Sequence, residues 1–121
     1  MHTSSLIRPV NSLIFVSDRA GGRIPLWQKN KQVLSTDSCI SVACYPEQDG
    51  PTELSLGAGY EVDPGFRSEF DGMLEAPNRI VTVQDVTHEV LLSMSVAEQL
   101  VRVRIWLNHP RWANRITIGL G

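Results

Sequence analysis

The stretch Gln99-Leu-Val-Arg-Val-Arg-Ile-Trp-Leu-Asn108 says more about the fold than any other part of the chain. Successive side chains of an extended strand point to opposite faces of a sheet. One face of this strand therefore holds four apolar residues, Val101, Val103, Ile105 and Leu107. The other face holds Arg102, Arg104, Trp106 and Asn108. A strand that is apolar on one side only predicts a sheet packed against a second sheet.

The same alternation of apolar and polar residues recurs along the chain, with turn residues between the segments. It predicts strands over residues 12–17, 38–45, 52–56, 70–74, 79–86, 90–96, 99–108 and 116–120. The sequence Pro46-Glu-Gln-Asp-Gly-Pro51 is rich in turn formers, so we expect it to join 38–45 and 52–56 as a hairpin with a long loop. Between residues 23 and 34 the pattern allows either a short helix beginning at Pro25 or an irregular loop.

Short strands without a sustained helical period predict an all-β fold. We expect a single-domain antiparallel β-sandwich of about seven or eight strands that spans residues 1–121. The period also predicts the core. Its expected members are Ile40, Val42, Leu54, Leu56, Val90, Leu92, Met94, Val101, Val103, Ile105, Leu107, Ile116 and Ile118.

The composition is that of an ordinary globular protein, with 42% hydrophobic and 20% charged residues. The apolar run at residues 13–16 is too short for a membrane span or a secretory signal. Cys39 and Cys44 are five residues apart, so in one strand they would lie on opposite faces and could not form a disulfide. Two unpaired thiols fit a reducing compartment, and we expect a cytoplasmic protein without membrane association.

Charge is segregated along the chain although the net charge is only −2. Residues 47–75 hold eight carboxylates against one arginine, while residues 1–46 and 76–121 each have a positive balance. The acidic residues either solvate loops or form a surface that attracts a basic partner. Nucleic acid is disfavoured as the main partner, because the chain has no excess of positive charge to neutralise phosphates.

Motifs of catalysis or metal binding are not evident in the sequence. The three histidines, His2, His88 and His109, lie far apart and lack metal-ligand spacing. The sequence Gly57-Ala-Gly59 matches only part of a dinucleotide fingerprint and lacks its strand-to-helix context. The pairs Glu61/Asp63 and Glu69/Asp71 lack the order of a calcium loop. We therefore expect no catalytic residues, no metal and no cofactor, in a protein that is not an enzyme.

Two groups of residues are candidates for binding a partner. The first is the acidic set Glu61, Asp63, Glu69 and Asp71, and the second is the row Arg102, Arg104 and Trp106, which Trp112 could extend. Arginine and tryptophan are frequent interface anchors. Two alternatives stay open for the row: it packs under a loop with arginine stems on the indole, or Trp106 belongs to the buried set.

The order of several segments resembles the competence protein J family. The segments are Asn11-Ser-Leu-Ile-Phe-Val-Ser-Asp18, Trp27 after a spacer, Cys39-Ile-Ser-Val42, Ile80-Val-Thr-Val83, Val90-Leu-Leu-Ser-Met-Ser-Val96 and Val101-Arg-Val-Arg-Ile-Trp106. The resemblance covers most of the chain and implies a small β-sandwich. It also implies binding to, and inhibition of, a nuclease of the DNA-entry type. No binding signature of that family can be transferred residue by residue.

Two functional hypotheses follow. In the first, the chain is a non-catalytic protein-binding protein, such as a nuclease inhibitor, and association into oligomers is compatible with it. In the second, it is a small-ligand or carbohydrate-binding module in which Trp106 or Trp112 is a stacking platform. An exposed tryptophan beside a groove favours the second hypothesis, and an acidic surface favours the first.

Overall fold

The computed structural model describes residues 2–121, and its regular secondary structure is mostly β-strand. The strands are β1 (His2–Ile7), β2 (Leu13–Asp18), β3 (Val33–Ser35), β4 (Cys39–Ala43), β5 (Thr52–Ala58), β6 (Phe70–Glu75), β7 (Ile80–Asp85), β8 (Val90–Ser95), β9 (Leu100–Leu107) and β10 (Arg115–Leu120). Three short helices connect them, namely η1 (Val10–Ser12), η2 (Glu47–Asp49) and α1 (Gly59–Val62).

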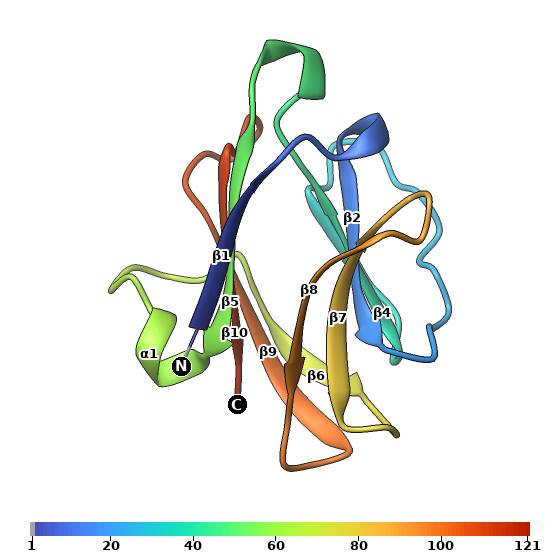
Figure 1. Ribbon diagram of the computed structural model, residues 1–121. Helices are drawn as coiled ribbons and strands as arrows, with labels where there is room; N and C mark the ends of the chain where they lie inside the picture. Colours follow the sequence, from blue (N-terminus) through green and yellow to red (C-terminus); the bar gives the residue numbers. More distant parts are fainter. Residues whose placement is uncertain (1) are drawn as a thin grey trace.

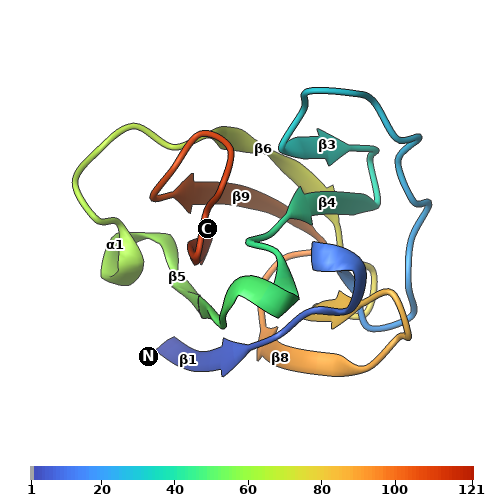
Figure 2. The same cartoon turned by 90° about the horizontal axis from the view of Figure 1, so that it is seen from above.

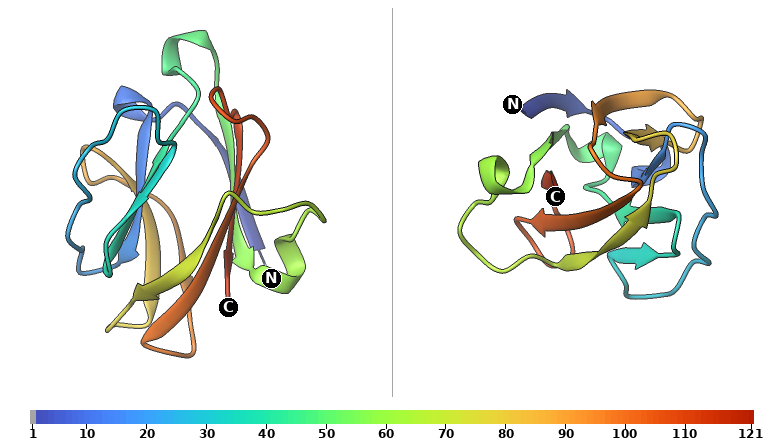
Figure 3. Two further views of the ribbon diagram at one scale, coloured as in Figure 1. Left: turned by 180° about the vertical axis from the view of Figure 1, so that it is seen from behind. Right: turned by 90° about the horizontal axis from the view of Figure 1, so that it is seen from below.

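These strands form two sheets that face each other (Figures 1 and 3). The first sheet has the order β1-β5-β10-β9-β6, and the second has the order β3-β4-β2-β7-β8. All neighbours are antiparallel except β5 and β10, which run parallel. The predicted β-sandwich is therefore confirmed, with one parallel pairing inside the first sheet.

The alternation along β9 decides which of its side chains are buried. Val103 and Ile105 are fully buried between the sheets and Val101 is nearly so. They pack in one cluster with Leu54 and Ile118 of the neighbouring strands of the first sheet, and with residues of the second sheet. Burying such side chains contributes about 1.5–3 kcal/mol each relative to exposure, so this cluster dominates the stability of the sandwich.

Most of the predicted core lies in this cluster, but the edge strand β8 differs. Val90 is 52% exposed, so its placement in the core is wrong. Leu92 and Met94 are only partly buried, as is Leu107 near the end of β9. The cause is the position of β8 at the edge of its sheet, where it has a partner on one side only, and a bulge at Val83/Gln84 that shifts its register against β7.

One expected connection differs, and a second, which the sequence leaves open between a helix and a loop, is decided in favour of the loop. The segments 38–45 and 52–56 do not form a hairpin, because β4 belongs to the second sheet and β5 to the first. The segment 46–51 instead crosses from one sheet to the other at the end of the sandwich (Figure 1). Residues 19–32 form a long irregular loop and contain no helix at Pro25. β1 and β3 were not expected, since their sequences do not alternate.

Candidate functional site

Two of the acidic candidates, Asp63 and Asp71, lie against the basic candidates Arg104 and Arg102 on the outer face of the first sheet. β6 is paired with β9 so that Asp71 lies opposite Arg104 and diagonal to Arg102. The Arg102 guanidinium donates through Nε to Asp71 Oδ1 at 2.9 Å and through Nη2 to Oδ2 at 2.7 Å. This bidentate bond from Arg102 lowers the pKa of Asp71 below its usual value and raises that of Arg102. The two sets that the sequence presented as alternatives thus neutralise each other in part.

Arg104 lies beneath α1 and the loop that follows it. Its side chain is only 17% exposed, and its Nη1 lies 3.4 Å from Asp63 Oδ2. The guanidinium carbon lies 5.1 Å from the centre of the Trp106 ring. The Nε atom is buried without a hydrogen-bond partner. Arg104 therefore connects the strand to the acidic loop, with most of its charge directed into the protein.

Trp106 is 2% exposed but lies outside the core cluster between the sheets, so the alternative that holds is the one in which this face packs under a loop with an arginine on the indole; Trp106 is not a stacking platform. Its indole Nε1 donates to the carbonyl oxygen of Phe66 at 2.9 Å. A Cβ on Gly119 of the adjacent strand would lie 2.9 Å from the ring, so that glycine leaves space for the indole. Trp106 thus anchors the loop 59–69 to the sheet.

The anchored loop presents two aromatic side chains that the sequence analysis did not single out. Tyr60 is 84% exposed and Phe66 is 53% exposed. Both belong to the same segment between β5 and β6 as Glu61, Asp63 and Glu69, so this segment combines aromatic and negatively charged groups. We define the acidic face by Tyr60, Glu61, Asp63, Phe66, Glu69 and Asp71. The signal that could have identified the aromatics is their position in a loop rich in glycine, proline and carboxylates.

Trp112 does not extend this surface. It lies in the loop 108–114 at the end of the sandwich, where it lines a groove of about 990 Å³ together with Trp27 from the loop 19–32. None of the residues of the acidic face lines this groove. We call it the tryptophan groove and define it by Trp27, Lys31, Gln32, Arg111 and Trp112. The candidate residues of the sequence therefore divide between two separate surfaces.

Side-chain hydrogen bonds hold the loop 108–114 in place. His109 Nδ1 accepts from the backbone N–H groups of Arg111 at 3.1 Å and Trp112 at 2.8 Å. Asn108 Oδ1 accepts from the N–H groups of Asn114 and Arg115 at the base of the loop. Such caps replace the backbone partners that an irregular segment lacks. The indole of Trp112 is consequently carried by an ordered turn.

Gln32 connects the two loops that form the tryptophan groove. Its amide Nε2 donates to the carbonyl oxygens of Pro110 and Arg111, which joins the loops 19–32 and 108–114. Figure 2 looks onto this end of the sandwich from above. Trp27 is 79% exposed and Trp112 is 52% exposed, so both indoles are accessible in the groove.

Within residues 2–121, no group of three or more histidine, cysteine or acidic side chains is arranged to hold a metal ion. No helix in the same range has the length and apolar character needed to cross a membrane. Cys39 and Cys44 are free thiols and both are buried.

Comparison with known proteins identifies a relative in fold. No protein-family model matches the chain, and no curated protein matches it in sequence. The crystal structure of ComJ from Bacillus subtilis, an inhibitor of the DNA-degrading activity of NucA, superposes with a TM-score of 0.71. The match covers 98% of this chain and 93% of ComJ, at 9% sequence identity. The chain therefore resembles ComJ in its fold, as the order of its segments indicated.

Proposed function

We propose that this protein is a non-catalytic protein-binding protein that inhibits a nuclease. The observation that carries the proposal is the similarity to ComJ, which extends over nearly the whole of both chains. Similarity of fold alone does not define a function, so the proposal also depends on the chemistry of a surface. The acidic face supplies that chemistry.

The acidic face suits a basic protein surface, such as the one with which a nuclease receives DNA. Asp63 and Asp71 are paired with arginines of β9, so they contribute little net charge. Glu69 forms no ion pair with any residue of the described range 2–121, so its negative charge is available to a partner. Complementary charge mainly raises the association rate, over a range of about 8–10 Å at physiological salt.

Tyr60 and Phe66 supply the contact area that charge alone does not give. Exposed aromatic residues among polar ones are frequent anchors of protein interfaces, because they bury much area at a low cost in side-chain entropy. The loop that carries them is fixed from below by the bond from Trp106 to Phe66 and by the pairing of Arg104 with Asp63. A loop held in one conformation loses less entropy on binding, which favours affinity.

A direct test measures DNA degradation by a nuclease of the NucA type, with NucA itself as the first enzyme. We expect an equimolar amount of this protein to suppress degradation and to form a complex with the nuclease in size-exclusion chromatography. Degradation at an unchanged rate in the presence of a large excess of the protein, with no complex formed, contradicts the proposal.

Variants locate the surface that is responsible. Charge reversal by Glu69→Lys and removal of aromatics by Tyr60→Ala and Phe66→Ala remove the two proposed features separately. We expect Glu69→Lys to lower the association rate and its dependence on salt, and the alanine variants to accelerate dissociation. Glu89→Lys is the matched control, because it reverses a charge in the turn between β7 and β8 of the other sheet. If reversal of Arg102 alone abolishes binding while Glu69→Lys has no effect, the basic row is the interface instead.

A further inference from the structure

The tryptophan groove is not used by the proposed function. Trp27 and Trp112 come from loops separated by most of the chain, yet they line the same hollow. Two accessible indoles in one groove are unusual for a surface that only meets water, because each exposes a large apolar ring. The groove's volume of about 990 Å³ is sufficient for a small ligand.

The polar residues of the groove are of two kinds. Carboxamides predominate, and they belong to Asn11, Gln28, Asn30, Gln32 and Gln48. Each carboxamide both donates and accepts hydrogen bonds, as do the hydroxyl groups of sugars. The remaining polar groups include two cations, Lys31 and Arg111, and no carboxylate is among the described residues that line the groove.

The two cations are available to a ligand. Within the described residues 2–121, neither Lys31 nor Arg111 takes part in an ion pair with a carboxylate. This differs from β9, where Arg102 and Arg104 are engaged with aspartates. Lys31 lies one residue before Gln32, whose amide bonds the carbonyl of Arg111, so the hydrogen bond that joins the two loops also brings their cations to the same groove. An anionic group in the groove would complete their pairing.

We propose that the tryptophan groove binds an acidic saccharide, such as a short oligosaccharide of uronic acids. The apolar C–H face of a sugar ring stacks on an indole, and the carboxamides bond its hydroxyl groups. Lys31 and Arg111 bind its carboxylate. Each class of groove residue thus has a counterpart on this type of ligand, and a neutral sugar would leave the cations unpaired.

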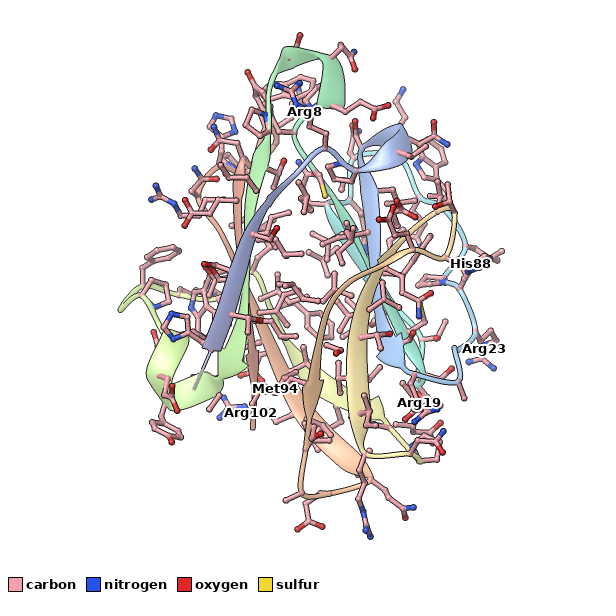
Figure 4. The ribbon with its side chains drawn as sticks, viewed as in Figure 1. Arg8, Arg19, Arg23, His88, Met94 and Arg102 are labelled. Atoms are coloured by element: carbon pink, nitrogen blue, oxygen red, sulfur yellow. The ribbon has the colours of Figure 1, made fainter. Side chains whose placement is uncertain are left out.

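Single-stranded nucleic acid also combines rings with negative charge, but the surroundings of the groove favour a short ligand. Glu47 and Asp49 flank Gln48 of the groove on the exposed helix η2. Arg8, at the top of Figure 4, donates to the carbonyl oxygen of Glu47, and the Glu47 carboxylate forms no ion pair within residues 2–121. A phosphate backbone leaving the groove on this side would meet two carboxylates, whereas a saccharide short enough to end inside the groove would not.

The test uses the full chain and three probes of similar length: galacturonate oligosaccharides, neutral galactose oligosaccharides and an oligothymidylate. Binding is measured by calorimetry and by tryptophan fluorescence. We expect the galacturonate probe to bind and to change the fluorescence, with an affinity at least about tenfold higher than that of the neutral sugar. Absence of binding by the galacturonate probe at millimolar concentration overturns the proposal, and so does tighter binding of the oligothymidylate.

Variants connect the binding to the groove. Trp27→Ala and Trp112→Ala are each expected to weaken the galacturonate affinity by at least about tenfold. The pair Lys31→Gln and Arg111→Gln is expected to abolish the preference for the acidic over the neutral sugar. Tyr60→Ala, which removes an exposed aromatic of the acidic face, is the matched control and leaves the affinity unchanged. Binding that persists at full strength in both tryptophan variants overturns the assignment. None of these measurements involves a nuclease. The outcome of the saccharide-binding experiments is therefore independent of the proposed nuclease inhibition.

Discussion

The acidic face and the tryptophan groove use similar residue types in opposite ways. On the acidic face, Arg102 and Arg104 are bound to aspartates, and Trp106 is buried. In the groove, Lys31 and Arg111 have no carboxylate partner within residues 2–121, and both tryptophans are accessible. Charges and rings that are already engaged within the chain maintain its structure, while those left without a partner are available to a ligand.

This difference changes how the acidic face can act. Arg104 and Trp106 of β9 support the face, because Arg104 pairs with Asp63 and Trp106 bonds Phe66 of the loop 59–69. What the face offers a partner is carried by that loop, in Tyr60, Phe66 and Glu69. The groove, by contrast, is formed directly by the side chains that we expect to contact its ligand. Substitutions of the residues that support the acidic face should therefore change both stability and binding. Substitutions in the tryptophan groove should change binding alone.

The largest expected effect is that of Val103→Asp, which would remove both regions at once. Val103 is fully buried at the centre of the sandwich. An unpaired carboxylate there costs several kcal/mol or more, which is comparable to the stability of a domain of this size. We expect the variant to show no cooperative thermal unfolding by circular dichroism.

Met73→Asp is its control, since Met73 is 50% exposed on β6 of the same sheet. We expect this variant to remain folded. A soluble and cooperatively unfolding Val103→Asp protein would mean that the register of β9 is wrong, and with it the assignment of Arg102, Arg104 and Trp106 to the outer face.

A pair of tryptophan substitutions tests the comparison itself. Trp106→Ala removes a buried ring and is expected to destabilise the protein by about 3–5 kcal/mol and to release the loop 59–69. Trp112→Ala removes an exposed ring and is expected to change stability by less than about 0.5 kcal/mol. Denaturant titration measures both. We expect Trp106→Ala to impair nuclease inhibition and Trp112→Ala to impair only saccharide binding. Equal effects of the two variants on stability would contradict the division into a supporting and an accessible tryptophan.

The division between residues that support the fold and residues that are accessible to a ligand could be predicted from the sequence only in part. The alternation along residues 99–108 identified the buried face of β9 and placed Arg102 and Arg104 on the other face. It could not decide whether that face was open, because this depends on the loop 59–69, which has no periodic pattern. The indole of Trp106 therefore had two equally acceptable environments until the bond to Phe66 was known.

The tryptophan groove could not be predicted from the sequence for a related reason. Trp27 and Trp112 are 85 positions apart in the chain and lie in irregular segments, whose path is set by single side-chain bonds such as those of Gln32 and His109. The alternation of apolar and polar residues likewise does not predict which strands pair. Period-2 patterns show which face of a strand is buried but not which strand is its neighbour, so the crossing of 46–51 between the sheets was mistaken for a hairpin.

Asp18 extends the comparison to a charge that is buried and fully paired. It is 1% exposed and accepts from the backbone and side-chain nitrogens of Asn78 at 2.9 and 2.6 Å, and from Ala20 N–H at 3.0 Å. Burial acts to raise the pKa of this carboxyl, but the bonds from Asn78 and Ala20, with the charge of Arg19, hold it below its usual value. An aspartate whose folded pKa is depressed stabilises the protein above its unfolded pKa, and this contribution is lost as pH falls through the folded value.

We therefore expect the melting temperature to decrease as the pH is lowered below about 4. Asp18→Asn should reduce this dependence of the melting temperature on pH. At neutral pH the variant should be less stable by about 2 kcal/mol, because it loses hydrogen bonds to a charged acceptor. Asp49→Asn on the exposed helix η2 is the control and should leave the pH profile unchanged. An Asp18→Asn protein with the stability and pH profile of the original would show that this paired charge does not support the fold.

The smallest expected effect concerns the floor of the groove. Cys44 lines it but is only 5% exposed, and burial raises the pKa of its thiol to about 12. Cys39 is 2% exposed with a pKa of about 11 and does not line the groove, so it serves as an internal reference. Because alkylating reagents attack the thiolate, we expect both cysteines to react slowly with iodoacetamide at pH 8 until the protein unfolds.

Gln32→Ala removes the bonds that join the two loops and should accelerate labelling of Cys44 by about threefold to tenfold, with Cys39 unchanged, as measured by mass spectrometry of the labelled peptides. Equal acceleration at both sites would indicate general loosening of the sandwich, whereas rapid labelling of Cys44 in the unaltered protein would mean that the groove extends into the core instead of ending at a closed floor.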